Sequence, residues 1–499
     1  MEFTSILDLR ESPDRNLPRP ALYGDLNLDQ VIGRAAGSWG EATKKLYYHF
    51  PADEECETYR REVFADVKRP SVRQTLLVFT EKMELWKDAR ERKKKVREEV
   101  QGHVWHIVET SRWCGALEGL AEGLAGEDCR SGGLCLFRKY LQEYLDSEDY
   151  REMRAGAVRL HERLCGFRLR LTYEKELLAV SEEQTKGTYE AFLKECFPTH
   201  GRELKNPFTA EEGLSILEYE VIKIFRKKHE DFFREAASFH EAHRECAREK
   251  LLLFGEEIKF YLSFAEFRDK MQERGFAFAA PDARKDREMY ATGLYDLALA
   301  CVNAAEQKEV VSNDVHFSEG ERFFVLTGPN QGGKTTFARS LGQLVYFARM
   351  GLDVPAASAN VPHFGKLLTH FSVEESVETG RGKLKEELVR LAPMMEENET
   401  GAFVVINELF TTAANYDACI MGKRVLEHFI GQGCRGIYVT HLKELAEERP
   451  GVVSLRATLD ERKVQTFRIL RSEAEESACA VNQVNKYQLT YSQLKERLS

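Results

Sequence analysis

The sequence predicts an α/β domain built around a phosphate-binding loop, preceded by an elongated, mainly α-helical region with a small strand-containing insertion. Three observations predict this fold. Proline is absent between Pro70 and Pro198 and between Pro207 and Pro281, and both stretches are rich in helix-forming residues. After Pro281, short apolar runs alternate with helical patterns. A glycine-rich loop directly follows one of these runs.

Composition excludes several classes of protein. The 499 residues suffice for about two to four domains, and 43% hydrophobic with 31% charged residues describes a globular chain, neither disordered nor fibrous. Lys and Arg total 72 against 82 Asp and Glu, so nucleic-acid contact requires a local basic patch. No apolar run reaches membrane-spanning length and no secretory signal opens the chain, so we expect a cytoplasmic protein without membrane contact.

The residues before Pro281 show helical periodicity with one interruption. Apolar side chains recur at helical spacing in two sets, Phe254, Ile258, Tyr261, Leu262 and Ala265, and Leu214, Leu217, Val221, Ile224 and Phe225. The spacing changes after Cys165, where Phe167, Leu169, Leu171 and Tyr173 alternate with polar residues as in a half-exposed strand. We therefore expect a small strand-containing insertion in a helical body.

Three apolar runs after Pro281 have the length of buried strands. They are Phe323–Leu326, Phe403–Ile406 and Gly436–Val439. Helical patterns separate them, which predicts a mainly parallel sheet. Since the carboxyl ends of parallel strands share one edge, the polar residues that follow these runs are expected to gather there.

The phosphate-binding motif G-x-x-x-x-G-K-[ST] occupies Gly328–Thr335, after the first of these runs. A helical pattern follows, so the loop is expected to open a helix whose N-terminal amides face an anion. We expect Lys334 to contact the β and γ phosphates of ATP and Thr335 to ligate Mg²⁺. The predicted ATP-binding residues are Gly328, Pro329, Asn330, Gln331, Gly332, Gly333, Lys334, Thr335 and Thr336.

Asn407 and Glu408 follow the second run, in the arrangement of a Walker B strand. An aspartate normally stands at the position of Asn407, where its charge orients the Mg²⁺ shell. The amide keeps an acceptor without the charge, which corresponds to a loss of about 10- to 100-fold in metal affinity or activity. Glu408 is expected to orient or deprotonate an attacking water.

His441 lies just past the third run, where a helix is expected to start. Its position at the same sheet edge predicts a sensor of the γ-phosphate. The alternative is a purely structural histidine.

Together these motifs resemble the MutS family of ABC-type ATPases. Thr327–Thr335 matches the family loop T-G-P-N-x-x-G-K-[ST], Val354-Pro-Ala follows one helix later, and Thr440–Leu445 matches T-H-x-x-E-L after the last strand. The resemblance covers residues 300–470. It implies an ABC-type P-loop domain in residues 286–499, including a C-terminal helical tail, and Mg²⁺-dependent hydrolysis of ATP.

Upstream the resemblance is weaker. It implies a helical core in residues 1–110 that returns in residues 246–285, with a lever and clamp-like insertion in residues 111–245. It also implies a homodimer joined through the ATPase domains. In such a dimer the helical arms surround double-stranded DNA that is mispaired or branched, and repair or recombination proteins are further partners.

The sequence departs from the family pattern in the parts that act across the dimer. Gly382 replaces the serine that contacts the γ-phosphate held by the other subunit, and Lys383 is a candidate to supply charge in its place. Val310 replaces the aromatic residue that stacks on adenine. We expect a short member that lacks the N-terminal mismatch-recognition domain and any C-terminal nuclease module.

Basic residues gather in the stretch Lys87–Arg97. Within it Lys93, Lys94 and Lys95 are candidate contacts to DNA phosphates, and Arg168 and Arg170 on the expected strand form a second set. The alternative for the first set is a solvated helix face.

Two functions stay open at this point. The first is ATP-dependent DNA binding in which slow hydrolysis resets a clamp, and Glu408 and His441 favour it. The second is a nucleotide-gated DNA-binding scaffold with weak or no turnover, and Asn407 and Gly382 favour it.

Overall fold

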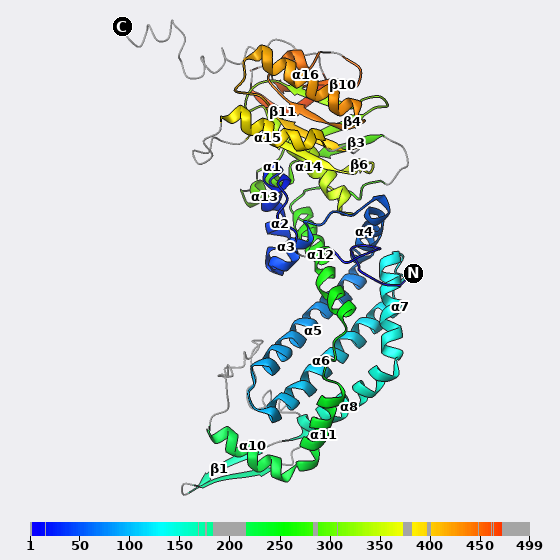
Figure 1. The fold of residues 1–499 in the computed structure, drawn as a ribbon, viewed down its shortest axis with the longest axis vertical. Helices are drawn as coiled ribbons and strands as arrows, with labels where there is room; N and C mark the ends of the chain where they lie inside the picture. Colours follow the sequence, from blue (N-terminus) through cyan, green and yellow to red (C-terminus); the bar gives the residue numbers. More distant parts are fainter. Residues whose placement is uncertain are drawn as a thin grey trace, which may run out of the picture. The chain divides into compact units, whose positions relative to one another are not determined.

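The computed structural model describes residues 2–14, 16–167, 169–174, 177–182, 216–282, 288–306, 308–372, 382–396, 401–447, 449–460, 462 and 464–471. The chain divides into two compact units. The helical unit contains the first N-terminal residues and Lys68–Ile258, and the sheet unit contains Thr4–Val67 and the chain from Lys259 onward. Figure 1 shows the fold and labels many of the helices and strands.

Long helices build the helical unit, as the proline-free stretches predict. They are α5 (Pro70–Lys95), α6 (Glu99–Ala125), α7 (Gly132–Asp146), α8 (Glu148–Gly166), α10 (Ile216–Lys228), α11 (Glu230–Ala242) and the first part of α12 (Glu249–Gln272). Pro70 opens α5, where its missing N–H is not needed. The hydroxyls of Ser131 and Ser147 cap α7 and α8. Among the described helices, none combines the length and apolar composition that crossing a membrane requires.

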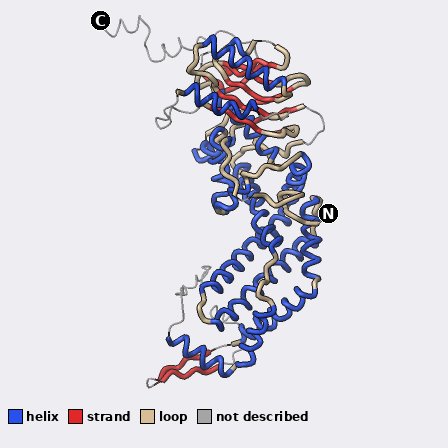
Figure 2. Tube along the Cα trace, in the orientation of Figure 1, coloured by secondary structure: helices blue, strands red, loops and turns tan. Residues whose placement is uncertain are grey.

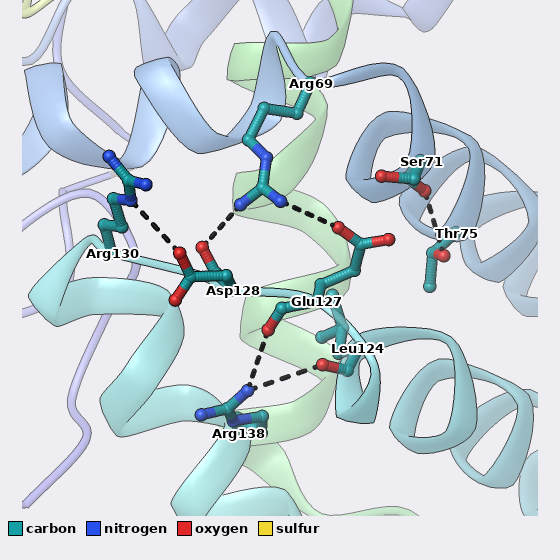
Figure 3. A network of polar contacts seen from close by, with 8 residues as sticks. All are labelled: Arg69, Ser71, Thr75, Leu124, Glu127, Asp128, Arg130 and Arg138. Atoms are coloured by element: carbon teal, nitrogen blue, oxygen red, sulfur yellow. Dashed lines mark hydrogen bonds and ion pairs between the residues drawn. The ribbon is translucent and has the colours of Figure 1, made fainter.

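A polar network closes the turn between α6 and α7 (Figure 3). Arg138 Nη1 donates to the carbonyl oxygens of Leu124 and Glu127, at 3.5 and 3.2 Å, and Arg69 binds the Glu127 carboxylate at 3.0 Å and the carbonyl of Asp128. The last carbonyls of a helix have no partner within the helix. Arg138 supplies such a partner for Leu124 at the end of α6, and Arg69 binds the residues that directly follow the helix.

The predicted strand after Cys165 is confirmed. β1 (Leu169–Glu174) pairs with β2 (Leu177–Glu182) as an antiparallel hairpin. Phe167 is the C-cap of α8, so the strand begins two residues later than the alternation suggested. Arg168 lies outside the described residues, as does the side chain of Arg170.

The two predicted apolar faces differ in how far they are buried. On α12, Phe254, Ile258, Tyr261, Leu262 and Ala265 are all buried, as predicted. On α10, Val221 is buried but Ile224 is 48% exposed, so the predicted face is wrong at Ile224. Leu214 and the side chain of Leu217 lie outside the described residues. The periodicity located these helices but did not fix which side of α10 is covered.

Short helices begin the sheet unit. They are α1 (Leu22–Asp25), α2 (Leu28–Ala36), η1 (Gly37–Trp39), α3 (Glu41–Leu46) and α4 (Glu54–Val67). The hydroxyls of Tyr23 and Tyr346 each donate to the carbonyl oxygen of Tyr47, at 2.7 and 2.8 Å, and their oxygens lie 2.7 Å apart. All three tyrosines are buried. This tyrosine cluster joins the last turn of α14 (Lys334–Arg349) to α1 and to the end of α3.

A six-stranded sheet forms the centre of the sheet unit, where its strands are drawn in red in Figure 2. In spatial order the strands are β11 (Gln465–Arg471), β10 (Val452–Leu459), β5 (Phe323–Thr327), β9 (Arg435–Val439), β8 (Phe403–Asn407) and β7 (Leu367–Phe371). Neighbours from β10 to β7 are parallel and only β11 is antiparallel. The mainly parallel sheet and its three predicted strands are confirmed.

Both faces of the sheet are covered, because every residue of β5, β8 and β9 is buried. One face forms a buried cluster with α16 (Asn415–Gly431) and with Leu391 and Met394 of α15 (Lys383–Glu396). The helix α14 packs against β7, β8 and β9. A second, antiparallel sheet contains β4 (Asn313–Phe317), β3 (Met289–Leu294) and β6 (Ser358–Asn360), and α13 (Leu297–Glu306) follows β3.

Gly436 lets β9 lie close to its neighbours, because a Cβ there would be 2.1 Å from the carbonyl oxygen of Val404 and 2.9 Å from the Phe323 ring. We expect Gly436→Ala to lower the free energy of unfolding by about 1–3 kcal/mol, the usual cost of an overpacked core. Urea denaturation measures this change. Gly431→Ala is the matched control, since a Cβ at Gly431 meets no atom within 4 Å. Equal midpoints for Gly436→Ala and the wild type would contradict the prediction.

Candidate nucleotide-binding site

The glycine-rich loop joins β5 to α14, as the motif predicts. Its backbone takes positive φ at Gly328 (130°), Gln331 (62°) and Gly333 (84°), and Gly333 is the N-cap of α14. A Cβ on Gly328 would lie 3.0 Å from the backbone nitrogen of Ala457, so this position has room only for glycine. The loop therefore directs the first amides of a 16-residue helix outward, an arrangement that favours anions.

A cavity of about 660 Å³ lies beside this loop. Its lining comes from the loop, from the start of α14, from α13 and the segment after it, and from β11. The lining residues are Leu294, Tyr295, Asp296, Leu299, Asn303, Glu309, Val310, Val311, Asn313, Asn330, Gln331, Gly333, Lys334, Thr335, Thr336, Phe337, Ser340, Glu408 and Phe467. The volume is within the range of small-molecule sites, which is about 300–1,000 Å³.

Lys334 is 5% exposed, and its ammonium is held within the loop itself. Nζ donates to the carbonyl oxygens of Gly328 and Pro329, at 3.0 and 2.8 Å. An ammonium group is a compact charge with three donors. The loop thus holds the one lysine of its motif at the wall of the cavity.

Thr335, in the first turn of the helix that follows β5, meets Asn407, the last residue of β8, at the carboxyl edge of the sheet. The strand β9 lies between β5 and β8. Thr335 Oγ1 donates to Asn407 Oδ1 over 3.0 Å. Both oxygens are of the kind that Mg²⁺ prefers. The predicted pairing of loop and Walker B strand is therefore possible in this geometry, with a neutral amide where a carboxylate is usual.

Glu408 lines the cavity from a strained turn that follows β8. Glu408 and Phe410 both have left-handed backbones, with φ of 54° and 63°. Such a conformation costs a residue with a side chain about 1–2 kcal/mol. The turn is fixed by a hydrogen bond from the Glu408 amide to the Val439 carbonyl at 2.9 Å, and by burial of Leu409 and Phe410.

The structure does not bring His441 to the cavity. The imidazole is exposed, and the described residues that line the cavity do not include it. The segment is anchored instead by its neighbour, because the Thr440 amide donates to the Leu326 carbonyl at 3.0 Å. The helix start expected after His441 is a short 3₁₀ turn, η2 (Lys443–Leu445).

Gly382 is exposed and directly precedes α15, a helix that begins at Lys383. The side chain of Lys383 lies outside the described residues. The amide of Lys385 donates to the Gly382 carbonyl at 2.9 Å, as expected at a helix start.

The basic stretch of α5 is largely neutralised by neighbouring carboxylates. Lys93 pairs with the buried carboxylate of Glu109 at 2.5 Å, and Lys94 pairs with Glu91 at 2.7 Å. Burial raises the pKa of Glu109, but the Lys93 ammonium and the His106 ring, 2.5 and 3.6 Å from its Oε2, outweigh burial and leave that pKa below its usual value. This geometry favours a structural role for Lys93, while Lys95 is exposed.

Several lining residues were not predicted from the sequence, and two of them shape the cavity wall. The first is Phe467 of β11. Its ring is 44% exposed, its φ is 58°, and it lies over the loop, since a Cβ on Gly333 would be 3.2 Å from it. Asn313 fixes this strand, because its Nδ2 donates to the Phe467 carbonyl at 3.1 Å and its Oδ1 accepts from the Ile469 amide at 2.8 Å. Val310, which replaces an aromatic residue of the family pattern, also lines the cavity. Phe467 supplies an aromatic ring there from a different strand.

The second is Asp296, a buried carboxylate at the start of α13. Burial raises its pKa, against the hydrogen bonds from the Gln343 side chain and from the amides of Leu299 and Ala298. The Gln343 bond is 2.9 Å long and links α13 to α14. Asp296 thereby links α13, which lines the cavity, to α14, the helix that the loop opens.

Comparison with known proteins supports the resemblance in this part of the chain. Residues 324–487 match the family model for MutS domain V. The DNA mismatch repair protein MutS of Thermotoga maritima is 30% identical over 137 residues, which are 28% of this chain and 17% of that protein. The DNA mismatch repair protein msh-2 of Neurospora crassa is 28% identical over 163 residues, or 32% of this chain and 17% of that protein. The matched segment thus spans 17% of the length of these relatives.

Proposed function

We propose that this chain is an ATP-dependent DNA-binding protein of the MutS type that binds ATP with Mg²⁺ in the cavity beside α14 and hydrolyses it slowly. The observation that carries the proposal is the meeting of Lys334, Thr335 and Glu408 at one cavity on the carboxyl edge of a parallel sheet. Similarity to MutS domain V over residues 324–487 supports it.

The residues at the cavity fit both ATP and Mg²⁺. Lys334 and the first amides of α14 suit a polyphosphate, and the two oxygens 3.0 Å apart on Thr335 and Asn407 suit a hard cation that keeps part of its water shell. When bound, Mg²⁺ supplies positive charge that offsets the charge of the phosphates.

Each residue at the cavity has its own role in this proposal. Lys334 binds and orients phosphate oxygens, and Thr335 with Asn407 holds the metal. Glu408 orients the attacking water and accepts its proton. Phe467 covers the loop and gives the base a flat apolar surface.

For the DNA side, the relatives are named as DNA mismatch repair proteins. We extend this role to the chain as binding of mispaired or branched double-stranded DNA by a homodimer joined through its ATPase domains. Residues 111–245 would act as the lever and clamp, with Lys94, Lys95, Arg168 and Arg170 as phosphate contacts. Gly382 and Lys383 would face the nucleotide held by the second subunit, and repair or recombination proteins would be further partners.

Steady-state ATP hydrolysis tests this proposal. It should be measured without DNA and with duplex, mispaired and branched DNA, for the wild type, Lys334→Ala and Glu408→Gln. A DNA-coupled ATPase is supported if both substitutions abolish turnover and if one of the DNA forms changes the turnover of the wild type. Absence of ATP binding by the wild type would overturn the proposal.

The neutral amide of Asn407 favours a second function, a nucleotide-gated DNA-binding scaffold with little turnover. Gly382, which lacks a hydroxyl, points the same way. If this alternative holds, the wild-type protein binds ATP, but its rate of ATP hydrolysis is no greater than that of Glu408→Gln. DNA affinity would then depend on ATP binding alone.

Asn407→Asp separates the two functions. We expect it to raise metal affinity or turnover by about 10- to 100-fold, because it restores a negative charge beside Thr335. Titration of Mg²⁺ in the ATPase and ATP-binding assays measures both quantities. Unchanged Mg²⁺ dependence would show that Asn407 does not hold the metal.

Phe467→Ala is expected to weaken ATP binding by about 5- to 150-fold, the range that corresponds to about 1–3 kcal/mol for stacking of a base on an aromatic ring. Isothermal calorimetry with ATP and with inorganic triphosphate distinguishes the contribution of the base. The substitution should affect ATP and spare triphosphate. Equal weakening of both ligands would instead indicate that the ring supports the loop.

A further inference from the structure

A buried carboxylate behind the candidate site is not explained by nucleotide binding. Glu387 of α15 is 3% exposed, and its Oε2 accepts a hydrogen bond from the backbone amide of Phe410 at 3.0 Å. We propose that Glu387 is a positioning residue that holds the turn carrying Glu408, and thereby aims the Glu408 carboxylate at the attacking water. This inference rests on the proposed function.

The turn needs such support because of its backbone. Glu408 and Phe410, two residues apart, both have positive φ. The Glu408 amide is tied to β9 through the Val439 carbonyl, while the Phe410 amide is tied to α15 through Glu387. The two hydrogen bonds thus fix the turn at Glu408 and at Phe410, to β9 and to α15 respectively.

The helix that supplies the clamp is itself anchored. The His370 ring lies 3.3 Å from the Glu387 carbonyl, and Arg390 donates to the Phe371 carbonyl at 2.8 Å, so α15 is fixed to β7. Arg390 also binds the Asp25 carboxylate at 3.1 Å, and that carboxylate accepts from Thr369 at 2.7 Å. Glu387 therefore acts from a rigid base.

Substitution of Glu387 can be graded. Glutamine keeps a carbonyl oxygen that can accept from the Phe410 amide but loses the charge, whereas alanine removes the acceptor. Glu427→Gln is the matched control, because Glu427 is an exposed residue of α16 away from the turn.

The test combines two readouts on the full chain, steady-state ATP hydrolysis and amide hydrogen exchange of the segment around Phe410. We expect Glu387→Ala to lower kcat by about 10- to 100-fold, with KM within about two-fold of the wild type, since small displacements of a reacting group have effects of this size. Glu387→Gln should fall between Glu387→Ala and the wild type. The exchange at Phe410 should accelerate in the same order.

Exchange at Phe410 that is unchanged in both variants would overturn the inference, as would unchanged kcat. If Glu387→Ala does not fold, the comparison of Glu387→Gln with Glu427→Gln decides. If the wild type shows no turnover that depends on Glu408, the proposed hydrolysis fails. The exchange rate at Phe410 still decides in that case whether Glu387 holds the turn.

Discussion

Replacement of Lys334 by alanine is expected to weaken ATP binding by about 10- to 150-fold. The change removes a charge-assisted contact to phosphate, and hydrogen bonds to charged groups contribute about 1.5–3 kcal/mol. It also removes the donor that ties the carbonyls of Gly328 and Pro329, so the loop loses an internal support. Turnover should fall at least in proportion to the occupancy of the site.

Calorimetric titration with ATP and Mg²⁺ measures the affinity directly. Lys270→Ala is the control, because Lys270 is a largely exposed lysine of α12 that pairs with Glu266. Lys334→Ala with wild-type affinity would show that ATP does not bind at this loop. Matching melting temperatures of the two variants would exclude a loss of fold as the cause.

Glu408→Gln is expected to lower turnover by about 100-fold or more while ATP affinity stays within about two-fold of the wild type. A positioned general base contributes about 10²–10⁴ to a rate, and glutamine preserves the size of the side chain without its basicity. Single-turnover hydrolysis measures the chemical step, apart from product release. Glu427→Gln again controls for loss of an acidic residue, and turnover equal to that control would remove Glu408 from the mechanism.

The sequence predicted the parts of the fold that depend on local pattern. The proline-free stretches are long helices, and the three apolar runs are neighbouring parallel strands, because burial on both faces leaves a continuous apolar signal. The loop of Gly328–Thr335 joins a strand to a helix, as its motif predicts. Its motif requires turn, glycine and helix start within a few residues.

Contacts between distant residues could not be predicted in this way. Phe467 reaches the cavity only because β11 turns back along β10, and the Lys93 to Glu109 ion pair depends on how α5 packs on α6. Glu387 closely follows Gly382 and Lys383, where the sequence departs from the family pattern. Nothing in the sequence indicates that Glu387 is buried or that it accepts from the Phe410 amide. The roles assigned to Asn407, Glu408 and His441 stay predictions, with His441 exposed and outside the cavity lining.

The tyrosine cluster at the far end of α14 constrains how the phosphate loop can move. Tyr346 lies in the last turn of this helix, where its buried hydroxyl donates to the Tyr47 carbonyl and lies 2.7 Å from the Tyr23 hydroxyl. With about 1.5 Å of rise per residue, the 16 residues of α14 span about 24 Å. Because α14 is also buried along its length against the sheet, a shift of the helix along its axis at Lys334 would have to be matched at the tyrosines, where it would break buried hydrogen bonds.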